Sequence, residues 1–193
     1  MNTTLNEADF GDLSSDNPKA KYGLAKRLIE LSKTEPAKLY PHFEYFVTLL
    51  KSDNNILKWT AIDIIGFLSR ADDKGKIDSV LNRLIAFLKA EKLITANHAI
   101  SALGTIAVAR PSLQPKVARE FLKTERYRYE TQECLNIVLG KTIETFGLFF
   151  GELKNKRAVV EFVRRQTKNS RAATRNKALK FLKRAAALNT KGE

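Results

Sequence analysis

The chain has 193 residues, of which 44% are hydrophobic and 28% are charged, and its formal net charge is +13 at pH 7. This balance is typical of a packed soluble protein and excludes a chain that is disordered throughout. The length suits one domain or one short repeat array. Charged residues interrupt the apolar stretches well before the roughly 20 residues needed to cross a bilayer, so the sequence predicts no membrane-spanning helix.

The first 16 residues are acidic and contain no Lys or Arg. Their acidic residues are Glu7, Asp9, Asp12 and Asp16. A secretory signal begins with basic residues and an apolar run, so this segment is not expected to be one. Cys134 is the only cysteine, which excludes an internal disulfide framework and suits a reducing compartment. These features predict a cytoplasmic protein with a flexible acidic tail at residues 1–16.

A helical pattern follows this segment. Asp16-Asn17-Pro18 is typical of a helix start, because Asn or Asp can accept hydrogen bonds from free N–H groups and proline is tolerated in the first turn. From there apolar residues recur at spacings of three and four, and no segment alternates as a half-buried strand would. The predicted helices occupy residues 17–33, 36–51, 54–72, 77–90, 93–108, 111–122, 131–150, 154–168 and 170–188. The fold class is therefore predicted to be all-α.

A short motif of Ala, a large apolar residue and Gly recurs on one helical face. Its register positions, residues 61, 99, 142 and 178, are 38, 43 and 36 residues apart. Its members are Ala61 with Ile65-Gly66, Ala99 with Leu103-Gly104, Thr142 with Phe146-Gly147, and Ala178 with Leu182. A period of this length indicates stacked helical hairpins, each burying its apolar face against its neighbours. The glycines inside these helices are interpreted as places where helices approach closely.

The second helices of these hairpins, at residues 57–66 and 93–104, resemble those of the HEAT and armadillo repeat family. The resemblance covers residues 17–188 as about four and a half helical hairpins. It implies a right-handed α-α superhelix, a HEAT/armadillo-like solenoid, with the second helices lining its concave side. The sequence departs from the family pattern at Thr142, where alanine is usual, and after Leu182, where the glycine is missing. Residues 189–193 are predicted to be a C-terminal tail.

The residues opposite the buried stripe of each second helix are candidates for binding. A rotation of about 100° per residue places Trp59 and Asp63 away from the stripe that contains Ala61 and Ile65. Carried along the repeats, this register gives Tyr22, Lys26, Trp59, Asp63, Asn97, Ser101, Gly140, Glu144, Asn176 and Lys180. The resemblance implies that these residues, the predicted strip, pave the concave surface and bind a peptide or nucleic acid. The alternative is that Trp59 packs against the next repeat and the others are only solvated.

Positive charge concentrates at the C-terminal end. Residues 154–193 hold 13 Lys or Arg against two acidic residues, whereas residues 1–153 hold 21 against 19. The candidates for binding a polyanion are Arg164, Arg165, Lys168, Arg171, Arg175, Lys177, Lys180, Lys183 and Arg184. Summed like charge attracts phosphates, so this basic cluster predicts nucleic-acid binding. The alternative is the polar outer face that a terminal repeat needs for solubility.

Three local interpretations complete the C-terminal half. The connector Arg126–Tyr129 either covers the repeat edge with its tyrosines or adds stacking to a phosphate site. The predicted buried stripe of the last helix is Ala178, Leu179, Leu182 and Ala186. The free faces of that helix carry too few bulky apolar residues to favour a membrane surface.

No catalytic template is present in the sequence. His42 and His98 lack the neighbouring ligands of a zinc site, so no catalytic, cofactor-binding or metal-binding residue is predicted. HEAT-like alkylpurine DNA glycosylases use a concave Trp and an Asp one helical turn apart, as Trp59 and Asp63 are, but they also use a second Trp that this chain lacks. The leading interpretation is a non-catalytic binding module or scaffold for a protein or peptide. Nucleic-acid binding through the basic C-terminal repeat is the alternative and glycosylase activity the third; the oligomeric state stays open.

Overall fold

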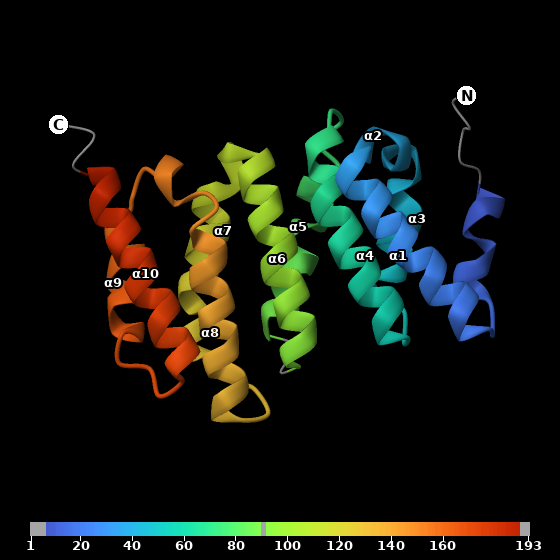
Figure 1. Ribbon diagram of the computed structural model, residues 1–193. Coiled ribbons are helices and arrows are strands. Elements are labelled where there is room, and N and C mark those ends of the chain that lie inside the picture. The colour runs from blue at the N-terminus through green and yellow to red at the C-terminus, as the bar shows by residue number, and fades with distance from the viewer. Residues whose placement is uncertain (1–6, 90–91, 190–193) are drawn as a thin grey trace. The chain divides into compact units, whose positions relative to one another are not determined.

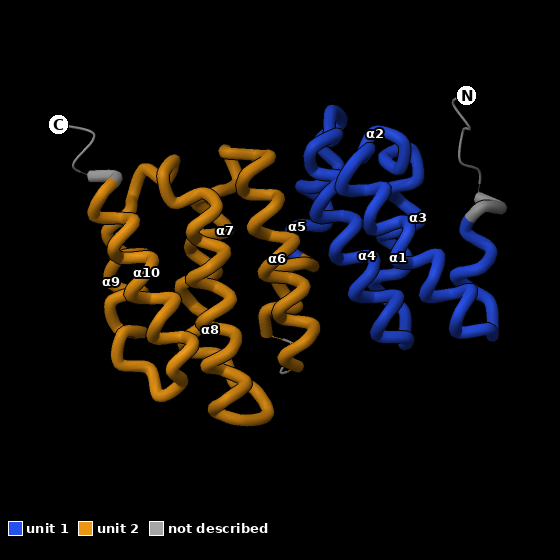
Figure 2. The backbone as a smooth tube through the Cα atoms, viewed as in Figure 1, with its two compact units in different colours: residues 1–82 blue, residues 83–193 orange. Residues whose placement is uncertain are grey.

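The computed structural model describes residues 7–89 and 92–189, and for residues 7–9, 188 and 189 it describes the backbone alone. All regular structure in these ranges is helical, without a strand, which confirms the all-α prediction (Figure 1). The chain forms two compact units, residues 1–82 and 83–193, which Figure 2 colours separately. The boundary between the units falls inside α5 (Ile77–Ala86).

Unit 1 is built around α1 and α4, which pack side by side. Its elements, with η for a 3-10 helix, are η1 (Glu7–Ser14), α1 (Pro18–Thr34), α2 (Pro36–Leu39), η2 (Tyr40–His42), α3 (Phe43–Leu49), α4 (Asn55–Leu68) and η3 (Ser69–Ala71). The Asn17 side chain accepts hydrogen bonds from the backbone N–H groups of Lys19 and Ala20, at 2.9 and 3.4 Å. Asn54 caps α4 in the same way. Both caps satisfy donors that a first helical turn leaves unpaired, so these two starts lie where the sequence predicts them.

The single helix predicted over residues 36–51 is interrupted. A 3-10 turn begins at Tyr40, and α3 starts only at Phe43. Pro41 lies in this turn, and it has no N–H to donate to the carbonyl group four residues earlier. The predicted continuous helix is therefore wrong, although Phe43 and Phe46 are buried as the periodicity indicates.

The η1 segment belongs to unit 1, contrary to the flexible tail predicted for residues 1–16. It packs against α1, and the side chains of Phe10 and Leu13 are each only 1% exposed. The ring of Phe10 stacks on that of Tyr45 with a centroid distance of 5.0 Å. Burying two large apolar side chains stabilises this segment in spite of its acidic composition. Residues 1–6 of the predicted tail lie outside the described residues.

Unit 2 consists of two helical layers. Its elements after α5 are η4 (Phe87–Lys89), α6 (Leu93–Ala109), η5 (Pro111–Leu113), α7 (Gln114–Leu122), η6 (Lys123–Arg126), α8 (Gln132–Phe146), η7 (Phe150–Glu152), α9 (Arg157–Gln166) and α10 (Ala172–Asn189). α6, α8 and α10 lie side by side with α8 in the middle, and α7 and α9 pack together on one side of them (Figure 1). The buried ring of Phe146 meets those of Phe121 and Phe162 between the layers, with centroid distances of 5.4 and 5.9 Å.

Glycines allow α8 to approach both of its neighbours. A Cβ atom on Gly104 of α6 would lie 2.1 Å from Cγ2 of Thr145 on α8. A Cβ atom on Gly140 of α8 would lie 2.8 Å from Oγ1 of Thr174 on α10. The interpretation of Gly104 as a place of close helix contact is therefore confirmed, because any larger residue there requires the Thr145 side chain or the helices to shift.

Two predictions about the last helices are wrong in detail. α8 ends before Gly147, where the chain turns into η7, and so is shorter at this end than predicted. The buried residues of α10 are Thr174, Ala178, Phe181 and Ala185. Leu179, predicted to be buried, is 55% exposed, because the contacts of α10 with α8 and α9 select the face that contains Phe181. α10 ends at Asn189, and residues 190–193 of the predicted tail lie outside the described residues.

Candidate binding site

The predicted strip lies on the solvent-accessible side of its helices, with one exception. It contributes Tyr22 and Lys26 from α1, Trp59 and Asp63 from α4, Asn97 and Ser101 from α6, Glu144 from α8, and Asn176 and Lys180 from α10. Each of these side chains is half-buried or exposed. Gly140 is the exception, because α10 packs over it and buries it. The register argument therefore holds for each helix taken by itself.

In unit 1 three of the four strip residues, Tyr22, Trp59 and Asp63, interact with other groups of the protein. The Asn54 side-chain amide donates a hydrogen bond to the Tyr22 hydroxyl at 3.4 Å, which ties Tyr22 to the cap of α4. Trp59 and Asp63 are half-buried, and each interacts with other groups of the chain. A role for this pair in holding a nucleoside stays a prediction.

In unit 2 a hollow of about 290 Å³ opens between α8 and α10, which we call the α8–α10 hollow. Its floor is apolar and includes Ile143, Phe150 and Phe181. The Phe150 and Phe181 rings meet edge to face with a centroid distance of 4.8 Å. Its rim carries the charged residues Glu144, Lys177, Lys180 and Arg184. The hollow therefore brings Glu144 and Lys180, which belong to the predicted strip, together with Lys177 and Arg184 of the basic cluster, of which Lys180 is also a member.

Among the residues that the structure describes, Glu144 is the only acidic one on this rim. Its Oε2 lies 2.8 Å from Nζ of Lys177. The hydrogen bond from Lys177 lowers the pKa of Glu144, burial opposes this shift, and the positive charges of Lys141 and Lys180 add to it. Glu144 is therefore ionised and already paired, so the rim as a whole remains positive.

A second, more open hollow adjoins the first. It lies between α6 and α8, and its lining includes Asn97, Ser101 and Lys141. Because Lys141 and Glu144 are three residues apart on α8, they lie on the same side of that helix. Together the two hollows form what we call the unit 2 face, defined by Asn97, Ser101, Lys141, Glu144, Lys177, Lys180 and Arg184.

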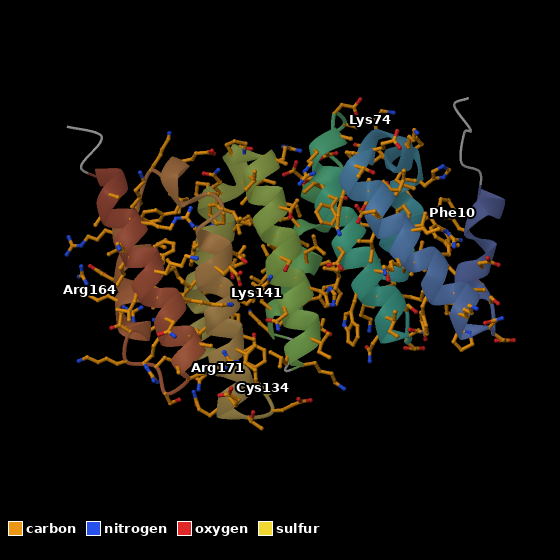
Figure 3. All side chains as sticks on the ribbon, viewed as in Figure 1. Phe10, Lys74, Cys134, Lys141, Arg164 and Arg171 are labelled. Atoms are coloured by element: carbon orange, nitrogen blue, oxygen red, sulfur yellow. The ribbon has the colours of Figure 1, made fainter. Side chains whose placement is uncertain are left out.

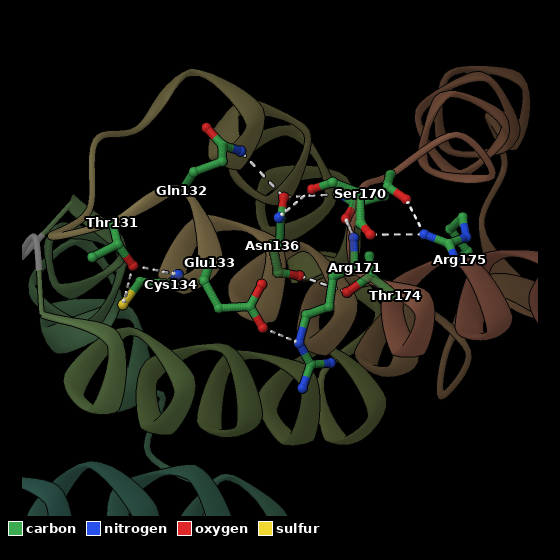
Figure 4. Close-up of polar contacts among 10 residues, drawn as sticks. Thr131, Gln132, Glu133, Cys134, Asn136, Ser170, Arg171, Thr174 and Arg175 are labelled. Carbon is green, nitrogen blue, oxygen red and sulfur yellow. Dashed lines mark hydrogen bonds and ion pairs between the residues drawn. The ribbon is translucent and has the colours of Figure 1, made fainter.

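Four of the nine residues of the basic cluster are held within unit 2. Arg165 pairs with Glu125 through two hydrogen bonds of 3.2 and 2.8 Å, and Lys177 pairs with Glu144. The other two are drawn in Figure 4, in which Arg171 Nε donates to Glu133 at 2.6 Å and Arg175 donates to the carbonyl groups of Asn169 and Ser170. These contacts tie α10 and the loop before it to the rest of the unit. They indicate a structural role for these four cations.

The remaining five side chains make no hydrogen bond or ion pair within residues 7–89 and 92–189. They are Arg164 and Lys168 on the α9 side and Lys180, Lys183 and Arg184 on α10. Figure 3 shows Arg164 extending from α9 into solvent. Lys180 and Arg184 lie at the α8–α10 hollow, and the other three lie outside it. The basic cluster therefore divides into four cations with structural contacts and five that are available to a partner.

The connector Arg126–Tyr129 covers an edge of unit 2. The Tyr129 hydroxyl donates to the carbonyl oxygen of Leu88 at 2.6 Å, and burial raises the pKa of Tyr129. The Tyr127 ring lies 5.7 Å from Nζ of Lys89. Both tyrosines are engaged with the segment before α6, which supports the covering role over the stacking role.

The charge asymmetry follows the division into units. Residues 83–193 hold 23 Lys or Arg against 9 acidic residues, whereas residues 1–82 hold 11 against 12. Unit 2 alone therefore has the field expected to attract an acidic partner.

Several residues of this site are not predicted by the sequence, Lys141, Phe150 and Phe181 among them. The register of the predicted strip falls on Gly140, one residue before Lys141. The helix predicted over residues 131–150 includes Phe150, and the predicted buried stripe of the last helix omits Phe181. The amphipathic spacing of Phe181 with Ala178 and Ala185 is a signal that could have found it.

Within the described ranges, no cluster of three or more His, Cys, Asp or Glu side chains is placed to hold a metal ion. No helix in these ranges has both the length and the apolar character needed to cross a membrane.

Comparison with known proteins identifies no family. No protein-family model matches the sequence, and no curated protein matches it. Among solved structures, the chain is similar to an engineered protein whose crystal structure comes from the Northeast Structural Genomics Consortium. The two share 12% sequence identity with a TM-score of 0.48, over 95% of this chain and 98% of the other. A likeness this distant carries no functional argument, so membership of the HEAT or armadillo family stays a prediction.

Proposed function

We propose that this protein is a non-catalytic binding module that holds an acidic segment of a partner protein on the unit 2 face. The observation that carries the proposal is the rim of the α8–α10 hollow. Three cations there stand against one carboxylate, and Lys177 already pairs with that carboxylate. An acidic segment would neutralise Lys180 and Arg184. Complementary charge of this kind speeds association and selects acidic partners over basic ones.

One feature of the face favours a peptide over a nucleic-acid backbone. The floor of the α8–α10 hollow is apolar, and a peptide can place apolar side chains there while a phosphodiester chain offers mainly charge.

Charge reversal on the rim tests the proposal. We expect the double variant Lys180→Glu/Arg184→Glu to bind fluorescein-labelled acidic peptides about 30-fold more weakly than the wild type, because two attractive contacts become repulsive. The matched control is Arg164→Glu/Lys168→Glu, which changes the net charge equally on the α9 side. The control is expected to retain most of the affinity in fluorescence anisotropy titrations at about 50 mM salt.

The same variants test nucleic-acid binding, which the unpaired Arg164, Lys168 and Lys183 favour as a second function. A duplex held by all five unpaired cations would show a salt slope of about −4.5, at about −0.9 for each phosphate contact. Both double variants would then weaken binding to labelled duplex DNA to a similar degree. The acidic-peptide proposal would be contradicted if the two double variants lost equal affinity for the acidic peptides, or if the wild type did not bind these peptides.

Removing the one carboxylate from the rim is expected to strengthen binding. Glu144→Gln abolishes the charge that pairs with Lys177 and so frees this lysine for the partner. We expect the affinity for an acidic peptide to rise about threefold, the size of one surface ion pair. Glu161→Gln is the control, because Glu161 also pairs with a cation, Arg157, but lies on α9 outside the hollow. An unchanged or lower affinity in Glu144→Gln would show that the carboxylate does not compete with the ligand.

We also infer that both units are built from HEAT- or armadillo-like repeats. Side-chain contacts between neighbouring hairpins join residues about one motif period apart within each unit. Examples are Asn54 with Tyr22, 32 residues apart, and Arg165 with Glu125, 40 residues apart. These separations are close to the 36- to 43-residue spacing of the sequence motif, as expected when each hairpin packs on the next.

A further inference from the structure

We propose that the α8–α10 hollow is the anchor site for one large apolar side chain of the acidic segment, such as leucine or phenylalanine, flanked by carboxylates. This inference rests on the proposed function and specifies what the partner must contain. It would make the recognised feature a short pattern, an apolar residue with acidic neighbours, and not acidity alone.

The size of the hollow suits a single side chain. Ligand pockets usually measure about 300–1,000 Å³, and the α8–α10 hollow, at about 290 Å³, is at the lower limit of that range. The space is too small for a large cofactor. It suits one apolar side chain of a peptide whose backbone passes over the rim.

The lining separates apolar from charged groups in the way such a ligand requires. Ile143, Phe150 and Phe181 are at most 7% exposed, so their side chains form a fixed apolar surface. Lys180 and Arg184 are one helical turn apart on α10 and both are exposed. A side chain on the floor would therefore be flanked by residues within reach of these two cations.

The fixed shape of the floor reduces the cost of binding. Phe150 and Phe181 hold each other edge to face. Phe181 is also part of the buried face of α10, next to Ala178 and Ala185. A surface that is already ordered loses little side-chain entropy when a ligand covers it.

Gly151 provides a variant that fills the hollow without disturbing the core. It lines the hollow, it is exposed, and a Cβ atom placed on it meets no atom within 4 Å. A leucine at this position would occupy the space proposed for the anchor. Gly11 provides the matched control, because it is also exposed in a 3-10 helix, in unit 1, with no atom within 4 Å of an added Cβ.

The experiment compares two acidic peptides of equal charge, one with a central phenylalanine and one with serine in its place. The wild type and the Gly11→Leu variant are expected to bind the phenylalanine peptide about tenfold more tightly, as burial of a large apolar side chain allows. In Gly151→Leu this preference should disappear while the affinity for the serine peptide stays within about twofold. Thermal unfolding followed by circular dichroism checks that both variants fold.

Each outcome decides between the two proposals. Equal binding of both peptides by the wild type would overturn the anchor site while leaving the acidic-segment proposal intact. A preference that persists in Gly151→Leu would also overturn it, because the apolar residue would then bind elsewhere. Failure of the wild type to bind either peptide would overturn both proposals.

Discussion

Replacement of Phe10 by alanine is expected to lower the free energy of unfolding of unit 1 by about 3–5 kcal/mol. Phe10 is 1% exposed, and the centroid of its ring lies 5.0, 5.0 and 5.7 Å from those of His42, Tyr45 and Phe46. Truncation removes these contacts and leaves a cavity that the neighbouring elements close only in part. Trp59 is the only tryptophan of the chain and lies in unit 1, so urea unfolding followed by its fluorescence measures the change.

Asp12 supplies the control for this variant. It lies in the same 3-10 helix but is exposed, so Asp12→Ala should change the free energy of unfolding by no more than about 0.5 kcal/mol. If Phe10→Ala had as small an effect, η1 would contribute nothing to unit 1 and the flexible tail expected from the sequence would be correct.

The burial of η1 could not be predicted from composition, because Phe10 and Leu13 are the only large apolar residues of this helix. Phe10 and Leu13 are three residues apart, a spacing that suits a 3-10 helix and an α-helix alike. Two residues are too few to establish a period. What stabilises the segment is an aromatic cluster contributed by α3 and η2, and this cluster is invisible until the fold places those elements beside it.

Helix starts and helix faces differ in how well the sequence predicts them. The starts at Asn17 and Asn54 depend on a local hydrogen bond between a side chain and the following turn, so the residues that determine them are adjacent. The buried face of α10 depends on contacts with α8 and α9. Leu179 and Phe181 lie on opposite sides of Ala178, so tertiary packing, and not periodicity, decides which of the two is buried.

The candidate site shows the same division between local and tertiary information. The register places Asn97, Ser101 and Glu144 on the accessible side of their helices, because rotation within one helix is a local property. It does not reveal that Lys177 pairs with Glu144, 33 residues earlier. That contact depends on α8 packing against α10. Glu144 and Lys177 therefore meet on one surface of unit 2 only because these two helices pack together.

Replacement of Gly104 by alanine is the second large effect expected, a loss of about 1–3 kcal/mol in the free energy of unfolding of unit 2. The added Cβ would lie 2.1 Å from the Cγ2 methyl group of Thr145. Thr145 is buried and β-branched, so this methyl group can move away only if the whole side chain rotates about its Cα–Cβ bond. The steric cost outweighs the gain of at most about 1 kcal/mol that alanine brings to a helix interior. Thermal and urea unfolding followed by far-ultraviolet circular dichroism measure the result.

Gly23 separates the steric effect from the helix propensity. It also lies inside an α-helix, but an added Cβ there would meet only the flexible end of Arg27, at 3.9 Å. Gly23→Ala should therefore stabilise unit 1 by up to about 1 kcal/mol, so the same substitution is expected to have opposite signs at the two positions. Thr145→Ser removes the clashing methyl group, so the double variant Gly104→Ala/Thr145→Ser should regain most of the stability lost in Gly104→Ala. If the double variant instead lost as much stability as the two single variants together, the contact between α6 and α8 would not be what restricts the size of residue 104. The spacing that places Lys141 beside Asn97 and Ser101 would then have another cause.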